Sequence, residues 1–571
     1  MPMKVVIVGG VAGGASTAAR LRRLDERAEI VLLERGPYIS FANCGLPYYI
    51  GGIISDRQKL LVTTAQSMST LFNVDVRPDS EVVAIDRAGH KVRVRERSLN
   101  GTCHEYEESY DKLVLAPGAV PLRPRLPGID HPRVFTVRNI PDTDAIQKFI
   151  TENHPKTAVV VGGGFIGLEM AENLYRRGLQ VSLVEMAPQV LATLLDPEMA
   201  AFVHHHLRAK GISLYLKNAV TGFFSQPDGS LQIALQHGSP LSTDLAILAV
   251  GVRPETALAR QAGLEIGAAG GIAVDAQLQT SDPDIYAVGD AIETPDWVSG
   301  RRAPVPLAGP ANRQGRTAAD ALAGRPAQYA GALGTAIVQV FDWAVAATGS
   351  TERSLQEAGI PFESVILHPL SHAGYYPGGT PLTIKLLFAP KDGKILGAQI
   401  VGSQGVDKRI DVLAAAMHFG ASVFDLQNLE LAYAPPFSSA KDPVNMAGYV
   451  AGNVVRGDLA VAHWHQVEAL RAAGWWILDV RTPQECKDGQ IDGAVNIPVQ
   501  QLRQRLDEVP KGRPILVYCA VGLRAYLAAR ILQQRGFGPV ADLSGGYRLY
   551  DAVTRDKSLI EEDLARLEET A

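Results

Sequence analysis

The segment "TAVVVGGGFIGLEMAENLYRRGLQVSLVEM", residues 157–186, decides the fold class. It begins with an apolar run typical of a buried parallel strand, continues through a glycine turn and then has helical apolar spacing. Gly162, Gly164 and Gly167 complete a G-x-G-x-x-G motif, which places helix N-terminal amides against a pyrophosphate. Glu185 ends the next strand, where an acid accepts a hydrogen bond from a ribose hydroxyl. The segment therefore predicts a dinucleotide-binding fold, and Glu185 favours NADH over NADPH, whose 2′-phosphate it would repel.

A second unit of this kind lies in "KVVIVGGVAGGASTAARLRRLDERAEIVLLE", residues 4–34. Gly9 and Gly14 occupy its turn, while Val11 stands where the motif has a middle glycine. Glu34 ends the following strand and can accept from a ribose hydroxyl. The segment predicts a second dinucleotide site, and the alternative is a glycine-rich turn that binds nothing.

The segment "TSDPDIYAVGDAIE", residues 280–293, carries a strand that ends near Asp290. A carboxylate at this place can accept a hydrogen bond from the ribityl chain of a flavin. Two dinucleotide units in succession therefore predict one site for FAD and one for NADH.

The composition is that of a globular enzyme with several domains. The chain has 571 residues, 46% of them hydrophobic and 20% charged, with a net charge of -5. This length suggests three to five domains, and the charge gives no indication of binding to nucleic acid or an anionic membrane. No apolar run approaches the roughly 20 residues of a membrane helix, and the N-terminus lacks the pattern of a signal peptide.

The cysteines are few and widely spaced: Cys44, Cys103, Cys486 and Cys519. Their spacing fits no disulfide framework, and no C-x-x-C pair indicates a metal site. We therefore expect no metal, a reducing cytoplasmic setting, and free thiols that serve either packing or chemistry.

With "LVLAPGAVP" at residues 113–121 and "AVGVRPET" at 249–256, the order of motifs resembles the FAD/NAD(P)-dependent pyridine nucleotide-disulfide oxidoreductases. The resemblance implies an α/β chain with two Rossmann-like domains, as in glutathione reductase, an α+β dimerisation domain, and therefore a homodimer. The expected segments are 1–115 and 251–325 for the FAD domain, 116–250 for the NADH domain, 326–452 for dimerisation and 458–571 for a separate C-terminal domain.

Cys44 lies in "SFANCGLPYYIGG", residues 40–52, and Tyr49 stands where two-thiol family members have their second cysteine. We expect Cys44 to begin a helix whose N-terminus lowers the pKa of the thiol. Its thiolate can attack an external sulfur and pass the oxidation state to reduced flavin. The stretch most resembles the coenzyme A-disulfide reductase branch. NADH peroxidases and oxidases, which use a sulfenic acid, and a buried structural cysteine are the alternatives.

The same resemblance implies a set of contacts with coenzyme A, as substrate or bound ligand. The residues that it assigns are Ser16, Arg20, Arg23, Ser40 and Asn43, with Lys441 near the ligand. A solvated helix face is the alternative for the two arginines.

The acid and base of glutathione reductase, a histidine–glutamate pair, are missing from this chain. Instead "LAYAPPFSSAKDPVN", residues 431–445, offers Tyr433, and "SHAGYYPGG", residues 371–379, offers two adjacent tyrosines. A phenol is protonated at neutral pH and can donate a proton to a leaving thiolate. By resemblance, Tyr433 and Tyr376, chosen over Tyr375, approach Cys44 from the second subunit.

The C-terminal segment contains "WWILDVRTPQECKDGQIDGAVNIP" and "PILVYCAVGLRAYLAARILQQRGF" and resembles an α/β rhodanese domain. Cys519 follows a strand, in a loop whose amides favour an anionic sulfur. Arg524 can stabilise that charge or orient an anionic donor. A cysteine phosphatase is the competing interpretation, but its C-x5-R loop is one residue longer than this one. Asp479 and Arg481 are expected to brace the loop.

The combination predicts an FAD-dependent NADH oxidoreductase that reduces a persulfide, a polysulfide or coenzyme A disulfide through Cys44. A persulfide on Cys519 would be coupled to this reaction. The alternatives are an NADH peroxidase or oxidase, and a non-catalytic flavoprotein NADH sensor with a rhodanese-like interaction module.

Overall fold

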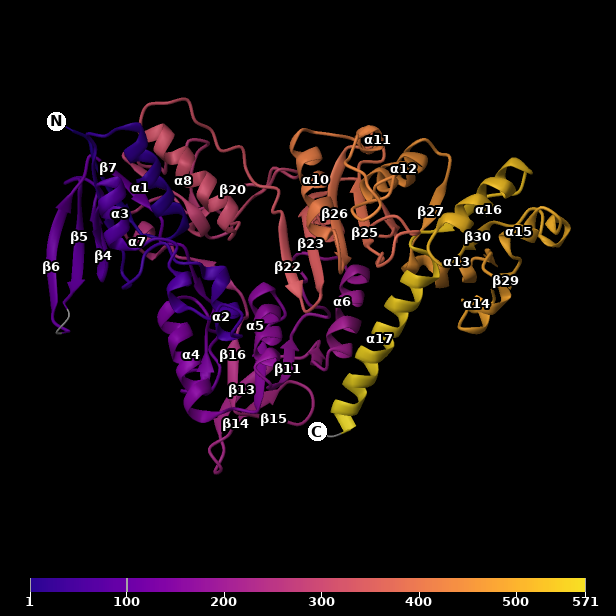
Figure 1. Cartoon of the computed structure of the whole chain (residues 1–571), viewed down its shortest axis with the longest axis horizontal. Helices are drawn as coiled ribbons and strands as arrows, with labels where there is room; N and C mark the ends of the chain where they lie inside the picture. The colour runs from indigo at the N-terminus through magenta and orange to yellow at the C-terminus, as the bar shows by residue number, and fades with distance from the viewer. Residues whose placement is uncertain (1, 99–100, 570–571) are drawn as a thin grey trace. The chain divides into compact units, whose positions relative to one another are not determined.

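The computed structural model describes residues 2–98 and 101–569 and divides into two compact units (Figure 1). Unit 1 comprises Met1–Val184, Val220–Leu235 and Pro240–Gly334. Unit 2 comprises Glu185–Ala219, Gln236–Ser239 and Thr335–Ala571.

The first sheet of unit 1 is parallel, with β1 at its centre. Its strands follow the order β19 (Ile285–Ala287), β7 (Lys112–Leu115), β1 (Lys4–Val8), β2 (Glu29–Leu33) and β3 (Asp75–Arg77). The central strands are buried and read as continuous apolar runs, as expected where both faces are covered. Helices α1 (Ala12–Leu24) and α8 (Ala308–Leu322) lie side by side in Figure 1.

The second parallel sheet of unit 1 repeats this plan around β10. Its strands include β11 (Gln180–Glu185), β10 (Thr157–Val161), β16 (Leu245–Leu248) and β9 (Val134–Phe135). Helix α5 (Phe165–Arg176) packs on β10 and β16. The prediction of two Rossmann-like domains is therefore confirmed.

Unit 2 contains an antiparallel sheet and a parallel one. The antiparallel order is β22 (Ala336–Val340), β23 (Trp343–Gly349), β26 (Ile395–Gly402), β25 (Thr383–Phe388) and β24 (Glu363–Leu367). Helix α10 (Val406–His418) packs on β23 and β26. The parallel order is β27 (Ala460–Ala462), β31 (Val540–Leu543), β30 (Ile515–Tyr518), β28 (Trp476–Asp479) and β29 (Val495–Asn496).

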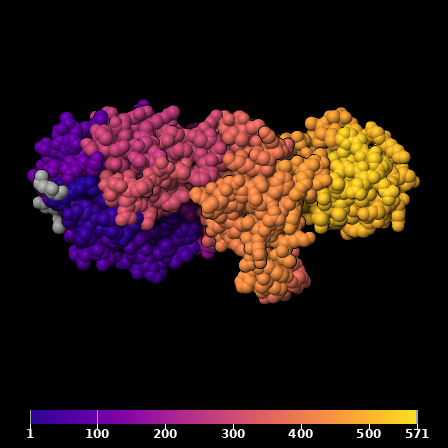
Figure 2. Space-filling model, turned by 90° about the horizontal axis from the view of Figure 1, so that it is seen from above, coloured from indigo at the N-terminus to yellow at the C-terminus, as the bar shows by residue number. Residues whose placement is uncertain are grey.

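The C-terminal helix α17 (Gly546–Glu569) ties the parallel-sheet domain to α6 (Pro197–Ala209). Asp556 on α17 accepts from His204 and Arg208, both at 2.7 Å. Figure 2 shows the yellow C-terminal residues directly against the orange part of unit 2. Helix α6 lies within the expected NADH segment of residues 116–250 and belongs to the compact unit 2.

A buried ion network joins α6 to the antiparallel sheet of unit 2. The ammonium of Lys385 is fully buried and lies 2.8 Å from Asp196 and 2.7 Å from Glu352, and it also pairs with Glu198. Burial alone would lower the pKa of Lys385, but the three carboxylates raise it. These carboxylates are the one cluster in the described part of the chain with the proximity of metal ligands, and Lys385 already supplies their counter-charge.

Replacing Lys385 by alanine leaves three buried acids without a cation. We expect the free energy of unfolding of unit 2 to fall by about 3–5 kcal/mol. Denaturant titration followed by tryptophan fluorescence measures this change, because four of the five tryptophans belong to unit 2. Lys391→Ala, at an exposed hairpin position of the same sheet, is the control. Equal effects of the two changes would contradict the prediction.

Candidate active site

A cavity of about 370 Å³ in unit 1 is lined by Gly9, Glu34 and Arg138 among other residues. It lies where β1 is flanked by β2 on one side and β7 on the other, the switch point at which such sheets bind nucleotides. Glu34 is held at its edge by hydrogen bonds from the amides of Gly10 at 2.8 Å and Gly36 at 2.9 Å.

Two glycines create this cavity by letting the backbone approach itself. Gly9 has φ +97°, and a Cβ there would lie 2.1 Å from the carbonyl oxygen of Ala116. A Cβ on Gly14 would lie 1.9 Å from the carbonyl oxygen of Gly9. No larger residue fits at either position. The structure places Gly9, Gly14 and Glu34 around one turn, as predicted.

Arg138 is a residue of this cavity that the sequence did not reveal. Its Nε is buried and has no hydrogen-bond partner within the described structure. Burial lowers the pKa of Arg138, while the charge of Asp290 opposes that shift. Burial likewise raises the pKa of Asp290. An orphaned guanidinium nitrogen beside a helix N-terminus suits a pyrophosphate, so these residues fit FAD.

The second glycine turn has the same close contacts. Gly162 has φ +107°, and its Cβ would lie 2.3 Å from the carbonyl oxygen of Ala249. A Cβ on Gly167 would lie 1.9 Å from the carbonyl oxygen of Gly162, and Gly164 caps α5. The predicted motif therefore has dinucleotide-binding geometry. Glu185 falls in unit 2, where its carboxylate accepts from the amide of Ala187 at 2.7 Å.

Cys44 is a free, exposed cysteine in the 3₁₀ turn η1 (Asn43–Gly45), which precedes the short helix α2 (Leu46–Ile50). Despite the exposure of the residue, partial burial raises the pKa of the thiol, and the charges of Glu169 and Asp290 raise it further. The expected lowering of this pKa is therefore wrong for the chain alone. Five residues of helix supply little positive potential, and two carboxylates oppose it.

Glu169, on α5, was not predicted from the sequence. It accepts a hydrogen bond from the hydroxyl of Tyr48 at 3.1 Å, where α2 packs on α5. Burial raises the pKa of Glu169 to about 7, although the bond from Tyr48 opposes the shift. A carboxyl group that titrates near neutrality and acts on Cys44 can hold or release a proton there.

The residues assigned to coenzyme A differ in how far they are engaged. Arg20 pairs with Asp320 of α8 at 2.7 Å, and the hydroxyl of Ser16 donates to Asn312 at 2.5 Å. Arg23 is exposed, and the buried Oδ1 of Asn43 has no partner in the described structure.

Two further members of that set are positioned separately. Ser40 adopts a left-handed φ of +44°, and its amide donates to the carbonyl of Gly10 at 2.8 Å. Lys441 is exposed and belongs to unit 2.

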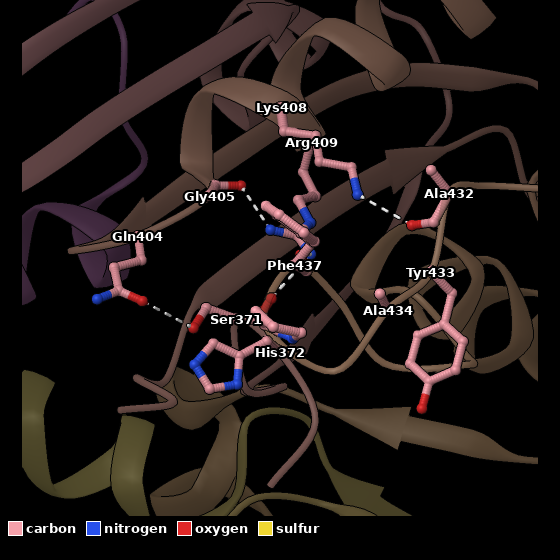
Figure 3. A pocket seen from close by; sticks show the side chains of 11 residues that line it. Ser371, His372, Gln404, Gly405, Lys408, Arg409, Ala432, Tyr433, Ala434 and Phe437 are labelled. Carbon is pink, nitrogen blue, oxygen red and sulfur yellow. Dashed lines mark hydrogen bonds between the residues drawn. The ribbon is translucent and has the colours of Figure 1, made fainter. Parts of the chain in front are cut away.

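A cavity of about 490 Å³ in unit 2 lies between α10 and the segment that carries Tyr433 (Figure 3). The hydroxyl of Tyr433 is 2.5 Å from that of Tyr375, and this hydrogen bond raises the pKa of Tyr375. Tyr376 instead packs edge-on against His372, with ring centroids 5.6 Å apart. The structure thus brings Tyr433 together with Tyr375 rather than with Tyr376, whose catalytic role stays a prediction.

Cys519 follows β30 and is only 1% exposed. Its sulfur accepts from the amide of Gly522 at 3.1 Å. Arg524, in the first turn of α16 (Leu523–Gln534), binds both carboxylate oxygens of Glu485, at 2.6 and 2.8 Å. The structure therefore brings Arg524, at the start of α16, to the loop of Cys519, and it adds Glu485, whose only signal in the sequence is its capping-box spacing from Thr482.

The loop is braced as predicted. Arg481 pairs with Asp479 at 2.7 Å, and its guanidinium lies 4.2 Å from the ring centroid of Tyr547. The amide of Tyr547 in turn donates to the carbonyl of Cys519 at 2.8 Å. Burial and Asp479 raise the pKa of Cys486 to about 11, which disfavours its thiolate.

Family models match three regions of the chain. Residues 3–315 match the pyridine nucleotide-disulphide oxidoreductases, residues 335–443 their dimerisation domain, and residues 463–552 the rhodanese-like domain. Helices that could cross a bilayer are missing from the part of the chain that the structure describes.

Two proteins of known structure match nearly the whole chain. Reduced CoADR-RHD from Bacillus anthracis is 50% identical with a TM-score of 0.94, covering 97% of this chain and 99% of that one. An NAD-dependent persulfide reductase from A. fulgidus is 38% identical with a TM-score of 0.89, covering 96% and 100%. A shorter relative by sequence, the coenzyme A disulfide reductase of Staphylococcus haemolyticus, is 37% identical over 78% of this chain and 99% of its own length.

Arg138→Met removes the unpaired guanidinium from the unit 1 cavity while keeping a similar length of side chain. A hydrogen bond to a charged group contributes about 1.5–3 kcal/mol, so FAD should bind roughly tenfold to a hundredfold more weakly. Reconstitution of flavin-depleted protein, followed by the absorbance of bound flavin, measures this. Arg123→Met, at an exposed arginine of the same unit, is the control. Unchanged FAD affinity in Arg138→Met would contradict the assignment.

Glu169→Gln removes a charge that raises the pKa of Cys44. We expect the pH midpoint for alkylation of Cys44 to move to a lower value, because the thiolate loses a repulsive neighbour. The rate of iodoacetamide labelling of the Cys44 peptide, measured across pH, reports this midpoint. Glu26→Gln, an exposed charge in the same unit, should leave it unchanged. A midpoint that rises, or stays in place, argues against the influence of Glu169.

Proposed function

Because this chain belongs to the pyridine nucleotide-disulphide oxidoreductase family, we propose that it uses NADH to reduce a persulfide, a polysulfide or coenzyme A disulfide, with coenzyme A persulfide as the preferred substrate. It is an oxidoreductase with FAD and a pyridine nucleotide as cofactors. The observation that carries the proposal is the presence of an unpaired Cys44 in the flavin unit and a loop-bound Cys519 in the same chain.

Gly9, Gly14, Glu34, Arg138 and Asp290 would hold FAD in the unit 1 cavity. When bound, FAD accepts a hydride from NADH and passes two electrons to a neighbouring sulfur. Every other role in the reaction belongs to side chains of this protein.

Cys44 acts as the nucleophile. Its thiolate attacks the inner sulfur of a persulfide R–S–SH, so a bond forms between Cys44 and that sulfur while the outer sulfur leaves as sulfide. Two electrons then split the mixed disulfide and restore the thiolate with release of R–SH. The balance is R–S–SH plus NADH plus one proton, giving R–SH, hydrogen sulfide and NAD⁺. Glu169, with a pKa near 7, holds a proton that the departing group can take.

The unit 2 tyrosines complete the site in a homodimer. The Tyr375–Tyr433 pair is exposed in the isolated chain and joined by a 2.5 Å hydrogen bond, which favours Tyr375 over Tyr376 as the partner of Tyr433. By family resemblance, these phenols approach Cys44 of the other subunit, and Lys441 lies near the coenzyme A bound there. Ser16, Arg20, Arg23, Ser40 and Asn43 would supply the remaining contacts.

Cys519 carries sulfane sulfur as its own persulfide and exchanges it with the thiol substrate. Linking the two thiols in one polypeptide raises the effective concentration of each for the other. Arg524 and the amide of Gly522 stabilise the anionic sulfur during this exchange.

An anaerobic panel of oxidants tests this function with wild type, Cys44→Ser and Cys519→Ser. Coenzyme A persulfide should be the best oxidant of NADH and release sulfide, and Cys44→Ser should lower that rate at least a hundredfold. Cys519→Ser should keep direct reduction of coenzyme A persulfide and impair use of other sulfur donors. Cys103→Ser, an exposed cysteine of unit 1, is the control.

Two outcomes of the panel would contradict the proposal. Hydrogen peroxide or oxygen as the best oxidant, with Cys519 irrelevant, would indicate a peroxidase or oxidase that uses a Cys44 sulfenic acid. NADH binding without turnover on any oxidant would indicate a sensor.

A further inference from the structure

Glu485 binds Arg524. Among the described arginines around the loop, Arg524 is the one whose interactions include the Cys519 sulfur. Both oxygens of Glu485 bind Arg524, and Oε2 also accepts from the amide and hydroxyl of Thr482 at 3.0 and 2.8 Å. The Glu485 bond, and then the charge of Cys519, raises the pKa of Arg524. The positive charge beside Cys519 is therefore matched by a fixed negative charge.

Two other arginines lie near the loop. Arg481 is buried and paired with Asp479. Arg548 is exposed, and its amide donates to the carbonyl of Ala520 at 3.0 Å. Arg524 is the arginine whose interactions include the Cys519 sulfur, and Glu485 already binds it through both oxygens.

The rim of the loop is apolar. Val521 and Leu523 flank the turn and are 39% and 66% exposed, and Leu527 follows one turn later on α16 at 47%. Apolar side chains at the entrance favour a donor whose sulfur is carried on an uncharged arm.

We propose that Glu485 is a specificity-determining residue, which restricts Cys519 to organic persulfides with an uncharged arm and excludes dianionic donors such as thiosulfate. This inference rests on the proposed role of Cys519 as a sulfur carrier. The Cys519 thiolate attacks the outer sulfur of R–S–SH, a new S–S bond forms, and the old one breaks. R–S⁻ leaves and takes up a proton, with no net oxidation. From thiosulfate, the same attack would bring two further negative charges against Glu485.

The test measures loading of Cys519 without NADH, in the full chain with Cys44→Ser, by mass spectrometry of the Cys519 peptide. The donors are the persulfide of 2-mercaptoethanol and thiosulfate, and the readout is the ratio of their rates. We expect the persulfide, whose arm is uncharged, to load Cys519 at least tenfold faster than thiosulfate. Glu485→Gln should raise the thiosulfate rate at least tenfold and change the other rate less than twofold, while Glu485→Asp should keep the original preference.

Glu508→Gln is the matched control, because Glu508 also binds an arginine through both oxygens, Arg505 at 2.6 and 2.7 Å. It ends the 3₁₀ turn η5 (Leu506–Glu508), which comes before β30 in the chain, whereas Cys519 follows that strand. A purely structural role of Glu485 would slow both donors together, and an unchanged ratio in Glu485→Gln would overturn the inference. Loading from neither donor would overturn the carrier role of Cys519 itself.

Discussion

The contact between a helix N-terminus and the end of a neighbouring strand, made through glycine, is the constraint on which this molecule depends. Gly14 meets the carbonyl of Gly9 so closely that no Cβ fits, and Gly167 meets Gly162 in the same way. Each contact lies at a strand–helix turn, the place where backbone amides bind a phosphate in folds of this kind. Arg138 lines the cavity at the first turn, and its buried Nε has no hydrogen-bond partner within the described structure, which suits an anionic ligand.

The two thiols of the proposed reaction occupy opposite environments. Cys44 is exposed at a short turn, and neighbouring carboxylates disfavour its anion in the chain alone. Cys519 is buried, yet the amide of Gly522 and the guanidinium of Arg524 interact with its sulfur. We infer that Cys44 depends on its substrate and flavin to become reactive, whereas Cys519 already has hydrogen-bond donors from the chain itself.

The sequence predicted those parts of the site that depend on local spacing. Each of these parts follows directly from one strand and its neighbouring turn: the glycine turns, Glu34, Asp290, and the loop from Cys519 to Arg524. The sequence did not predict three residues of the site, because their partners lie far along the chain and no catalytic or binding motif contains them: Arg138, Glu169 and Glu485. The raised pKa of Cys44 has the same origin, since Glu169 is 125 positions away. Tyr375 and Tyr376 are adjacent in sequence, but their surroundings differ in the fold. Tyr375 hydrogen-bonds to Tyr433, whereas Tyr376 packs against His372.

The proposed reaction requires that the sulfur of Cys44 form a covalent bond with the substrate and lose it on reduction. Mass spectrometry of the Cys44 peptide, after the holoenzyme is mixed with coenzyme A persulfide in the absence of NADH, detects this bond. We expect a coenzyme A adduct on Cys44 that disappears when NADH is added. An unmodified Cys44 in an enzyme that still turns over, or an adduct that persists in NADH, would rule the reaction out.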